Sequence, residues 1–178
     1  MFDCIKKWFF KRDIAAISNV KLKEPFAKPN VLSYDKVGIL YEADGSNNTA
    51  IDNFVKALKT ANQSTVTTLA YSNENVSKEG GESGVYYKNQ FNWYGIPKSS
   101  EIDNFTTVKF DVLFLLTTTF PSHFQYIIAK SAAKFKVGQN FEKGTQFLDL
   151  IIDTDSKSNV AILVQNIIKV INKIATQK

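Results

Sequence analysis

Residues 110–138 have the sequence FDVLFLLTTTFPSHFQYIIAKSAAKFKVG, and this stretch decides the fold class. Its five consecutive apolar residues, 112–116, do not alternate with polar ones, which is typical of a strand covered on both faces. Three threonines follow, and then Pro121, a residue favoured in the first turn of a helix, with Thr119 as the expected cap. Apolar residues at helical spacing and a short strand ending at Gly138 complete a strand–helix–strand unit.

The same pattern occurs a second time, nearer the N-terminus. Residues 36–43 predict a strand, residues 51–58 a helix with one apolar stripe, and residues 65–71 the next strand. Gly38 inside the first of these strands indicates close approach by a neighbouring element. Two such units favour a three-layer, Rossmann-like or flavodoxin-like α/β domain, with helices on both faces of a mostly parallel sheet of about five strands.

The remaining segments extend this sheet and its helical layers. Residues 85–87 predict a short edge strand, residues 100–105 a short helix and residues 160–174 a final helix with a wide apolar face. Residues 147–152 predict another buried strand. Too few residues precede it for a crossover helix, so we expect it to be antiparallel to its predecessor or not adjacent to it.

The chain divides into a basic N-terminal arm, residues 1–35, and a single α/β domain, residues 36–178. Of the net charge of +5, nearly all lies near the N-terminus, because eight bases and four acids occur up to Lys36. Residues 1–17 predict a helix that either docks on its own domain or binds a protein partner or an anionic membrane surface. Nucleic acid is a weaker candidate, because no RNA- or DNA-binding motif is present. The candidate partner-binding residues are Phe2, Ile5, Lys7, Trp8, Phe9, Lys11 and Arg12.

A second candidate site lies where the strand order is expected to reverse. Ligands of open parallel sheets bind there, beyond the carboxyl ends of the strands. We place this point between the turn after Tyr41 and the turn after Leu116, where helix N-termini favour an anion such as a phosphate. The expected ligand is of the phosphate or sugar type. Helix capping explains most of the same polar residues. The candidate ligand-binding residues are Glu42, Asp44, Asn47, Asn48, Thr117, Thr118, Thr119, Ser122 and His123.

Several classes of function lack their sequence motifs. Neither GxGxxG nor GxxxxGK[ST] nor GxSxG occurs, so no dinucleotide, P-loop or serine-hydrolase site is expected. Cys4 and His123 are the only residues of their kinds, which excludes an intramolecular disulfide and argues against zinc. We expect no cofactor and no metal. No apolar run approaches the ~18 residues of a membrane span, and no signal peptide is evident, so the expected location is cytoplasmic.

Residues 91–97, FNWYGIP, gather aromatic residues beside Gly and Pro. Such a loop is either pinned into the core or stacks on a ligand or partner. His123 is either a general base or a surface or capping residue of its helix. No catalytic constellation stands out. The leading hypothesis is therefore a non-catalytic cytoplasmic binding module, and the alternative is a small-molecule binding protein or enzyme.

Three motifs carry a resemblance to a known family: FNWYGIPKS at 91–99, FDVLFLLTTTFP at 110–121 and SAAKFKVG at 131–138. Together they resemble an uncharacterised family of small bacterial α/β proteins, a domain of unknown function that covers nearly the whole chain. This resemblance implies no activity. Residues 110–138 also remotely resemble the acceptor half of heptosyltransferase-type glycosyltransferases. Those enzymes have a second Rossmann-like domain for which this chain has no room, so the likeness implies a shared fold rather than transferase activity.

Overall fold

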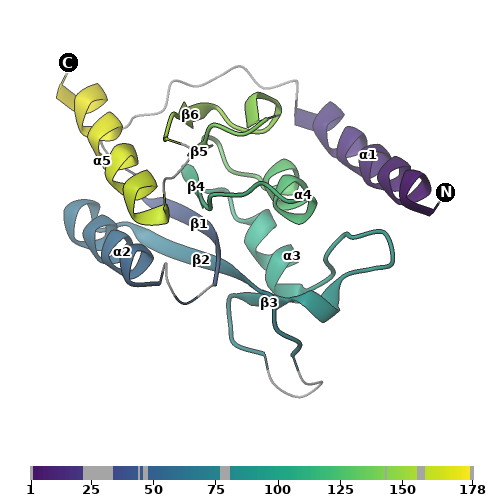
Figure 1. The fold of residues 1–178 in the computed structure, drawn as a ribbon. Helices are drawn as coiled ribbons and strands as arrows, with labels where there is room; N and C mark the ends of the chain where they lie inside the picture. Colours follow the sequence, from purple (N-terminus) through teal and green to yellow (C-terminus); the bar gives the residue numbers. More distant parts are fainter. Residues whose placement is uncertain are drawn as a thin grey trace.

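The structure is a computed structural model that describes residues 2–21, 34–43, 45, 48–76, 81–142, 144–155 and 159–176. In these ranges most helices and strands alternate along the chain (Figure 1). The helices are α1 (Phe2–Lys21), α2 (Asn48–Asn62), α3 (Ser100–Thr107), α4 (Ser122–Lys130) and α5 (Val160–Thr176). The strands are β1 (Lys36–Glu42), β2 (Thr65–Ser72), β3 (Val85–Tyr87), β4 (Val112–Leu116), β5 (Lys136–Gln139) and β6 (Leu150–Ile152).

The strands of the described ranges form one sheet of six, in the order β3-β2-β1-β4-β5-β6, and every neighbouring pair is parallel. The chain builds outward from β1 to β3 and then returns to the other side of β1 to place β4, β5 and β6. This is the doubly wound order of Rossmann-like proteins. The α/β fold with a parallel sheet is confirmed, with six strands rather than about five.

Strand β4 lies in the middle of the sheet, between β1 and β5, and all five of its side chains are buried. Because side chains alternate along a strand, β4 contributes to two cores. Val112, Phe114 and Leu116 point to one face of the sheet, and Leu113 and Leu115 point to the other. The unbroken apolar run therefore reflects helices above and below the strand, as the sequence predicts.

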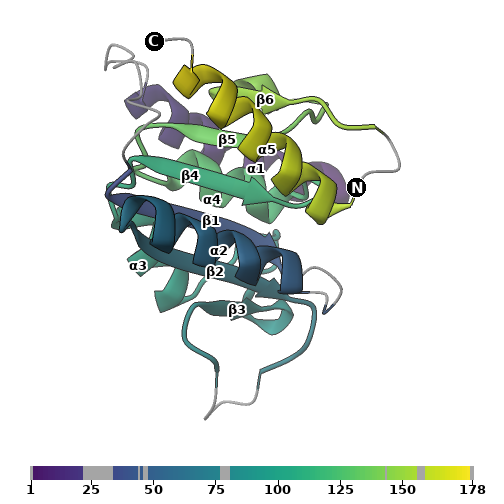
Figure 2. The ribbon, with the colours of Figure 1, turned by 90° about the vertical axis from the view of Figure 1, so that its left-hand side faces the viewer.

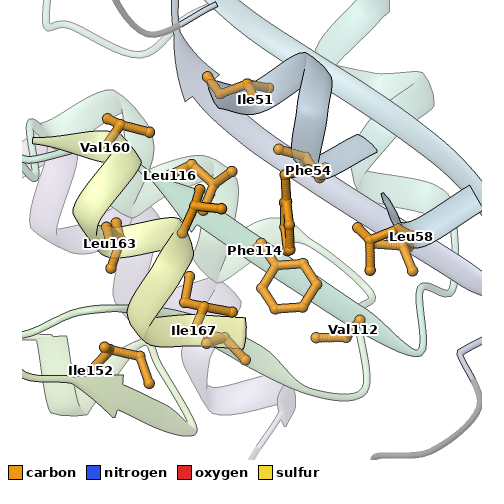
Figure 3. Close-up of a cluster of buried hydrophobic side chains, with 14 of the residues drawn as sticks. Ile51, Phe54, Leu58, Val112, Phe114, Leu116, Ile152, Val160, Leu163 and Ile167 are labelled. Atoms are coloured by element: carbon orange, nitrogen blue, oxygen red, sulfur yellow. The ribbon is translucent and has the colours of Figure 1, made fainter. Parts of the chain in front are cut away.

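Helices α2 and α5 lie next to each other on the first face (Figure 2). Phe54 of α2 packs edge-on against Phe114 of β4, with the ring centroids 5.2 Å apart. Leu163 and Ile167 of α5 reach the same cluster (Figure 3). Burial of such side chains stabilises the fold by roughly 1.5–3 kcal/mol each.

Helices α3 and α4 cover the second face, and α1 lies outside them against α4 (Figure 1). Ser99 caps α3, since its hydroxyl accepts a hydrogen bond from the Glu101 backbone N–H. Gly38 lets the Phe110 ring approach β1, because a Cβ at this position would lie 2.8 Å from that ring. The close approach predicted at Gly38 is thus an aromatic side chain of the core.

The last strand, β6, is parallel and adjacent to β5, so the prediction that it would be antiparallel or not adjacent is wrong. The chain returns between the two strands through the 3-10 turn Gly144–Gln146 without an α-helix. A short return is enough because strands of three or four residues span only about 10–13 Å. Leu148 from this connection covers Gly138 of β5, where an added Cβ would lie 3.0 Å from the leucine. The Leu148 side chain therefore covers a part of the sheet face that a crossover helix would otherwise cover.

Candidate functional site

The strand order reverses between β1 and β4, where Tyr41 pairs in register with Leu116. This is the position expected from the sequence. Glu42 ends β1 and is partly buried, and Asn48 begins α2 and is exposed. Asp44 and Asn47 lie outside the described residues, so nothing follows for them.

The residues after β4 form a turn that leads into α4. Thr117 is buried, and its Oγ1 accepts a hydrogen bond from the Thr119 backbone N–H at 3.2 Å. Thr118, Thr119 and Ser122 are exposed. The expectation that Thr119 caps the helix is wrong, because Pro121 occupies the cap position and provides no side-chain hydrogen bond. The threonines therefore stabilise their own turn and leave two hydroxyl-bearing side chains at the surface.

His123 is neither a surface residue nor a helix cap. Only 9% of it is exposed, and its Nδ1 is hydrogen-bonded to the hydroxyl of Tyr86 at 2.7 Å. Aromatic rings surround it, with centroids at 4.5 Å for Tyr71 and Phe124 and 5.3 Å for Phe91. We call these five residues the histidine cluster.

The histidine cluster is held in uncharged form. Burial lowers the pKa of His123 to about 4, so the imidazole is neutral at neutral pH. Burial, together with the nearby Tyr71 and Glu42, raises the pKa of Tyr86 well above its ordinary value. A neutral imidazole hydrogen-bonded to a neutral phenol satisfies two polar groups inside an aromatic environment. This arrangement is suited to a structural pair that engages Nδ1 of the imidazole.

Two hollows of the described surface lie away from the strand-order reversal. One, of about 400 Å³, runs between the edge strand β6 and α5, and the other, of about 360 Å³, lies beside β2 and α3. None of the candidate ligand-binding residues lines either hollow. Among the described residues, no three His, Cys, Asp or Glu side chains gather where they could hold a metal ion.

The candidate partner-binding residues lie on α1, which docks on the rest of the chain through Phe9. The Phe9 ring lies 5.5 Å from Trp93 and 5.7 Å from Tyr94 between centroids. Both of these rings belong to the loop after β3. No helix of the described chain is long and apolar enough to cross a membrane. The contacts of Phe9 with Trp93 and Tyr94 show that α1 docks on its own domain, which is one of the two alternatives for this helix.

The helix and the loop that it contacts leave large apolar side chains exposed. Trp8 is 59% exposed, Trp93 58% and Ile5 42%, and both tryptophan rings contact Phe9. The Arg12 guanidinium lies 5.6 Å from the Trp8 ring centroid. We call the surface formed by Ile5, Trp8, Arg12 and Trp93 the tryptophan patch. Lys7 and Lys11 are exposed on the same helix, and the side chain of Phe2 lies outside the description.

The loop at 91–97 holds its part of the patch rigidly. The Asn92 side-chain oxygen accepts hydrogen bonds from the backbone N–H groups of Tyr94 and Ile96. Gly95 has φ +90°, a conformation that L side chains rarely adopt, and Phe91 pairs with Pro97 across the loop base. As a result Phe91 lies in the histidine cluster while Trp93 stays at the surface.

A family model described as a family of unknown function (DUF6913) matches residues 6–174. The chain belongs to this family. The match confirms the resemblance to an uncharacterised family, whereas the remote likeness to heptosyltransferase-type enzymes stays a prediction. No curated protein and no solved structure matches the DUF6913 chain.

Tyr71 and Tyr86 were not among the candidate residues, and the sequence left open whether the loop that contains Phe91 and Trp93 is pinned into the core or faces a ligand or partner. Tyr71 and Tyr86 enclose His123, and Phe91 and Trp93 divide one loop between the two aromatic regions. The sequence held one signal for Tyr71 and Tyr86. Both lie near the carboxyl ends of predicted strands, and in a parallel sheet these ends lie along the same edge. No local pattern pairs Trp93 with α1.

Proposed function

We propose that this DUF6913 chain is a non-catalytic cytoplasmic binding module whose docking surface is the tryptophan patch. The observation that carries the proposal is that Trp8 and Trp93 are each more than half exposed. Tryptophan is highly buried on average, and exposed apolar patches mark interaction sites. Tryptophan is also enriched among the residues that dominate binding energy at interfaces. The single cysteine of the chain favours the reducing cytoplasm.

The state of His123 supports a role without catalysis. As the only histidine of the chain, it was the strongest candidate for acid–base chemistry. Its Nδ1 is engaged by Tyr86, its pKa is lowered to about 4 by burial, and aromatic rings enclose it. A general base that works at neutral pH needs a pKa near 7 and access to its substrate.

Two isoleucines of nearly equal exposure provide a matched test of the docking surface. Ile5 lies in the patch and is 42% exposed, whereas Ile162 lies on α5 and is 41% exposed. Wild type, Ile5→Glu and Ile162→Glu are recovered from native cytoplasm at low and high salt, and the proteins, lipids and small molecules that accompany them are identified by mass spectrometry. We expect one component to follow wild type and Ile162→Glu and to be lost from Ile5→Glu.

The opposite results have distinct meanings. If all three proteins carry the same components in the same amounts, the tryptophan patch is not a docking surface. If a stoichiometric small molecule follows all three, the binding-module proposal fails and the ligand alternative replaces it. Circular dichroism of each variant confirms that a lost component does not reflect unfolding.

The second candidate function is binding of a small phosphate- or sugar-type ligand at the strand-order reversal. What favours it is the position of the reversal between β1 and β4, next to the exposed Thr118, Thr119 and Ser122. The start of α4 also lacks a side-chain cap, and helix N-termini favour anions, although the N–H groups of Phe124 and Gln125 already donate to the Pro121 carbonyl. Amide NMR spectra recorded with inorganic phosphate and with sugar phosphates test this function. Absence of shifts at residues 117–123 at millimolar concentrations would remove it.

A further inference from the structure

We infer that the partner of the tryptophan patch is the headgroup region of an anionic lipid bilayer. This inference rests on the proposed function, because it names the partner of the same surface. It is drawn from three properties of the patch: its residue types, its charge and its rigidity.

The residue types fit the boundary between water and lipid. An indole ring combines a large apolar body with one N–H donor, and tryptophan is enriched at membrane interfaces for that reason. The patch presents two such rings, and the exposed Ile5 precedes Trp8 by three residues on the same side of α1. Partial insertion would remove their apolar surface from water while the N–H groups remain near the polar headgroups.

The charge around the patch is positive. The α1 segment contains five bases and two acids and so carries an excess of positive charge, although Arg12 is itself paired with Asp13 at 2.9 Å. Lys11 and Arg12 follow Trp8 by three and four residues, a spacing that places them on the same side of a helix. Each Lys or Arg near an anionic membrane strengthens binding on the order of five-fold. Apolar rings and cations are thus presented together.

The patch is formed before any partner arrives. Phe9 contacts Trp8, Trp93 and Tyr94, so the helix and the loop are fastened to each other. The Asn92 side chain fixes the loop from within. A surface that is already ordered loses little conformational freedom on binding, so a modest insertion of two rings can suffice.

A bilayer explains this combination better than an acidic protein or a nucleic acid. An acidic partner would pair with Lys11 and leave the exposed indoles without an apolar environment. Nucleic acid bases could stack on the rings, but stacking requires single strands and a groove that tracks their backbone. Only the bilayer boundary offers negative charge and apolar depth over one continuous surface.

The chain has a built-in probe for the test. Its two tryptophans are Trp8 and Trp93, so its intrinsic tryptophan fluorescence reports on the patch alone. The full chain is titrated with phosphatidylcholine vesicles that contain or lack phosphatidylglycerol, and separately with poly-glutamate. We expect a blue shift and co-sedimentation with the anionic vesicles, and no effect of the neutral vesicles or the polymer. Raising the salt from about 0.1 to 1 M shortens the Debye length from about 10 to 3 Å and should release the protein.

Matched variants separate the contributions to binding. Trp8→Ala should weaken binding to the anionic vesicles more than about ten-fold, because apolar burial is lost. Lys11→Gln should weaken it about five-fold, whereas Lys169→Gln, an exposed lysine on α5, should leave it unchanged. Trp8→Phe and Trp93→Phe keep an aromatic ring and leave one indole each. Lipids brominated on their acyl chains should quench both of these single-tryptophan proteins.

Three results would overturn the inference. They are no binding of the folded wild type to anionic vesicles, equal binding to neutral ones, and an equal response to poly-glutamate. In each case the proposed function is judged separately by the co-purification of Ile5→Glu and Ile162→Glu. A protein component that depends on Ile5, with no vesicle binding, would retain the docking surface and replace the bilayer by a protein partner.

Discussion

One loop contributes to two aromatic regions, and these regions differ in how far they are buried and in whether their polar groups are paired. In the histidine cluster, Phe91 faces inward with Tyr71, Tyr86 and His123. Two positions later, Trp93 faces outward beside α1. The Tyr86 hydroxyl and Nδ1 of His123 are hydrogen-bonded to each other, whereas the apolar surface of Trp93 is left in water.

This difference teaches how to separate structure from function in an aromatic-rich chain. An enclosed cluster whose polar groups are paired gains nothing further from a ligand, and its residues act on stability. An exposed cluster gains free energy when something covers it. Substitutions in the two regions should therefore act on different measurements.

The largest effect is expected from truncation inside the histidine cluster. Phe124→Ala removes a fully buried ring and should lower the free energy of unfolding by about 3–5 kcal/mol, because the cavity cannot collapse. Trp93→Ala removes a larger ring from the surface and should cost less than about 1 kcal/mol. Urea unfolding followed by circular dichroism measures both. Similar losses would show that the loop tip is as structural as the cluster.

The next effect is a dependence of stability on pH through His123. Its folded pKa of about 4 lies below the unfolded value of about 6.5, so protons bind preferentially to the unfolded chain. Stability should be full above about pH 6.5 and fall by roughly 3 kcal/mol as the pH decreases to 4. NMR titration of the single imidazole gives the folded pKa directly. A value near 6.5 in the folded protein would contradict the enclosed cluster.

The control for this pH dependence removes both polar partners. The double variant His123→Phe with Tyr86→Phe has no imidazole to titrate and no buried hydroxyl left without its partner. Urea unfolding of the double variant between pH 4 and 6.5 should show a shallower loss of stability than that of the wild type.

A smaller effect is expected from the hydrogen bond alone. Tyr86→Phe leaves Nδ1 of His123 buried without its partner and should cost about 1–2 kcal/mol. Tyr94→Phe alters a tyrosine next to Phe9 in the other region and should change stability by less than about 0.5 kcal/mol. Thermal unfolding of the two variants measures this difference. Equal shifts in Tm would show that the Tyr86–His123 hydrogen bond contributes no special stability.

The smallest effect on stability is expected in the tryptophan patch. Ile5→Glu replaces an exposed side chain and should change the free energy of unfolding by less than about 0.5 kcal/mol. Its effect should appear in the binding of the tryptophan patch to anionic vesicles. The new carboxylate weakens this binding because it is negatively charged and because it is polar. Thermal unfolding and vesicle co-sedimentation of the same preparation test both parts together. Unchanged vesicle binding, or a large loss of stability, would contradict the division between a histidine cluster that acts on stability and a tryptophan patch that acts on binding.

Much of the fold could be predicted because its signals are local. The unbroken run of β4 indicates burial on both faces, and the strand–helix–strand spacing around it indicates a parallel sheet. Polar turns after β1 and β4 locate the ends where the strand order reverses. Gly38 inside a predicted strand indicated a close approach, and the structure contains it.

The last strand shows where a local rule failed. A parallel connection was taken to require a crossover helix, and residues 140–149 are too few for one. The rule assumes strands of ordinary length, whereas β5 has four residues and β6 has three. Leu148 covers part of the sheet face, so the shorter return is stable.

The candidate sites were harder to predict because each depends on contacts between distant segments. The environment of His123 comes from β2, β3, the loop at 91–97 and its own helix. The basic and aromatic character of α1 was evident from its residues, but its contact with Trp93 was not. Periodicity shows which face of an element is apolar and does not identify its neighbour.

The Phe9 contact has a consequence for the order of events at the ribosome. Trp8 emerges first, and Trp93 follows only after eighty-five further residues, which at about 5–20 residues per second takes several seconds. Throughout that interval the newly made helix has no surface of its own chain to rest on. The tryptophan patch is consequently completed late in synthesis. A peptide that carries only the first twenty-one residues would lack Trp93, one of its two tryptophans.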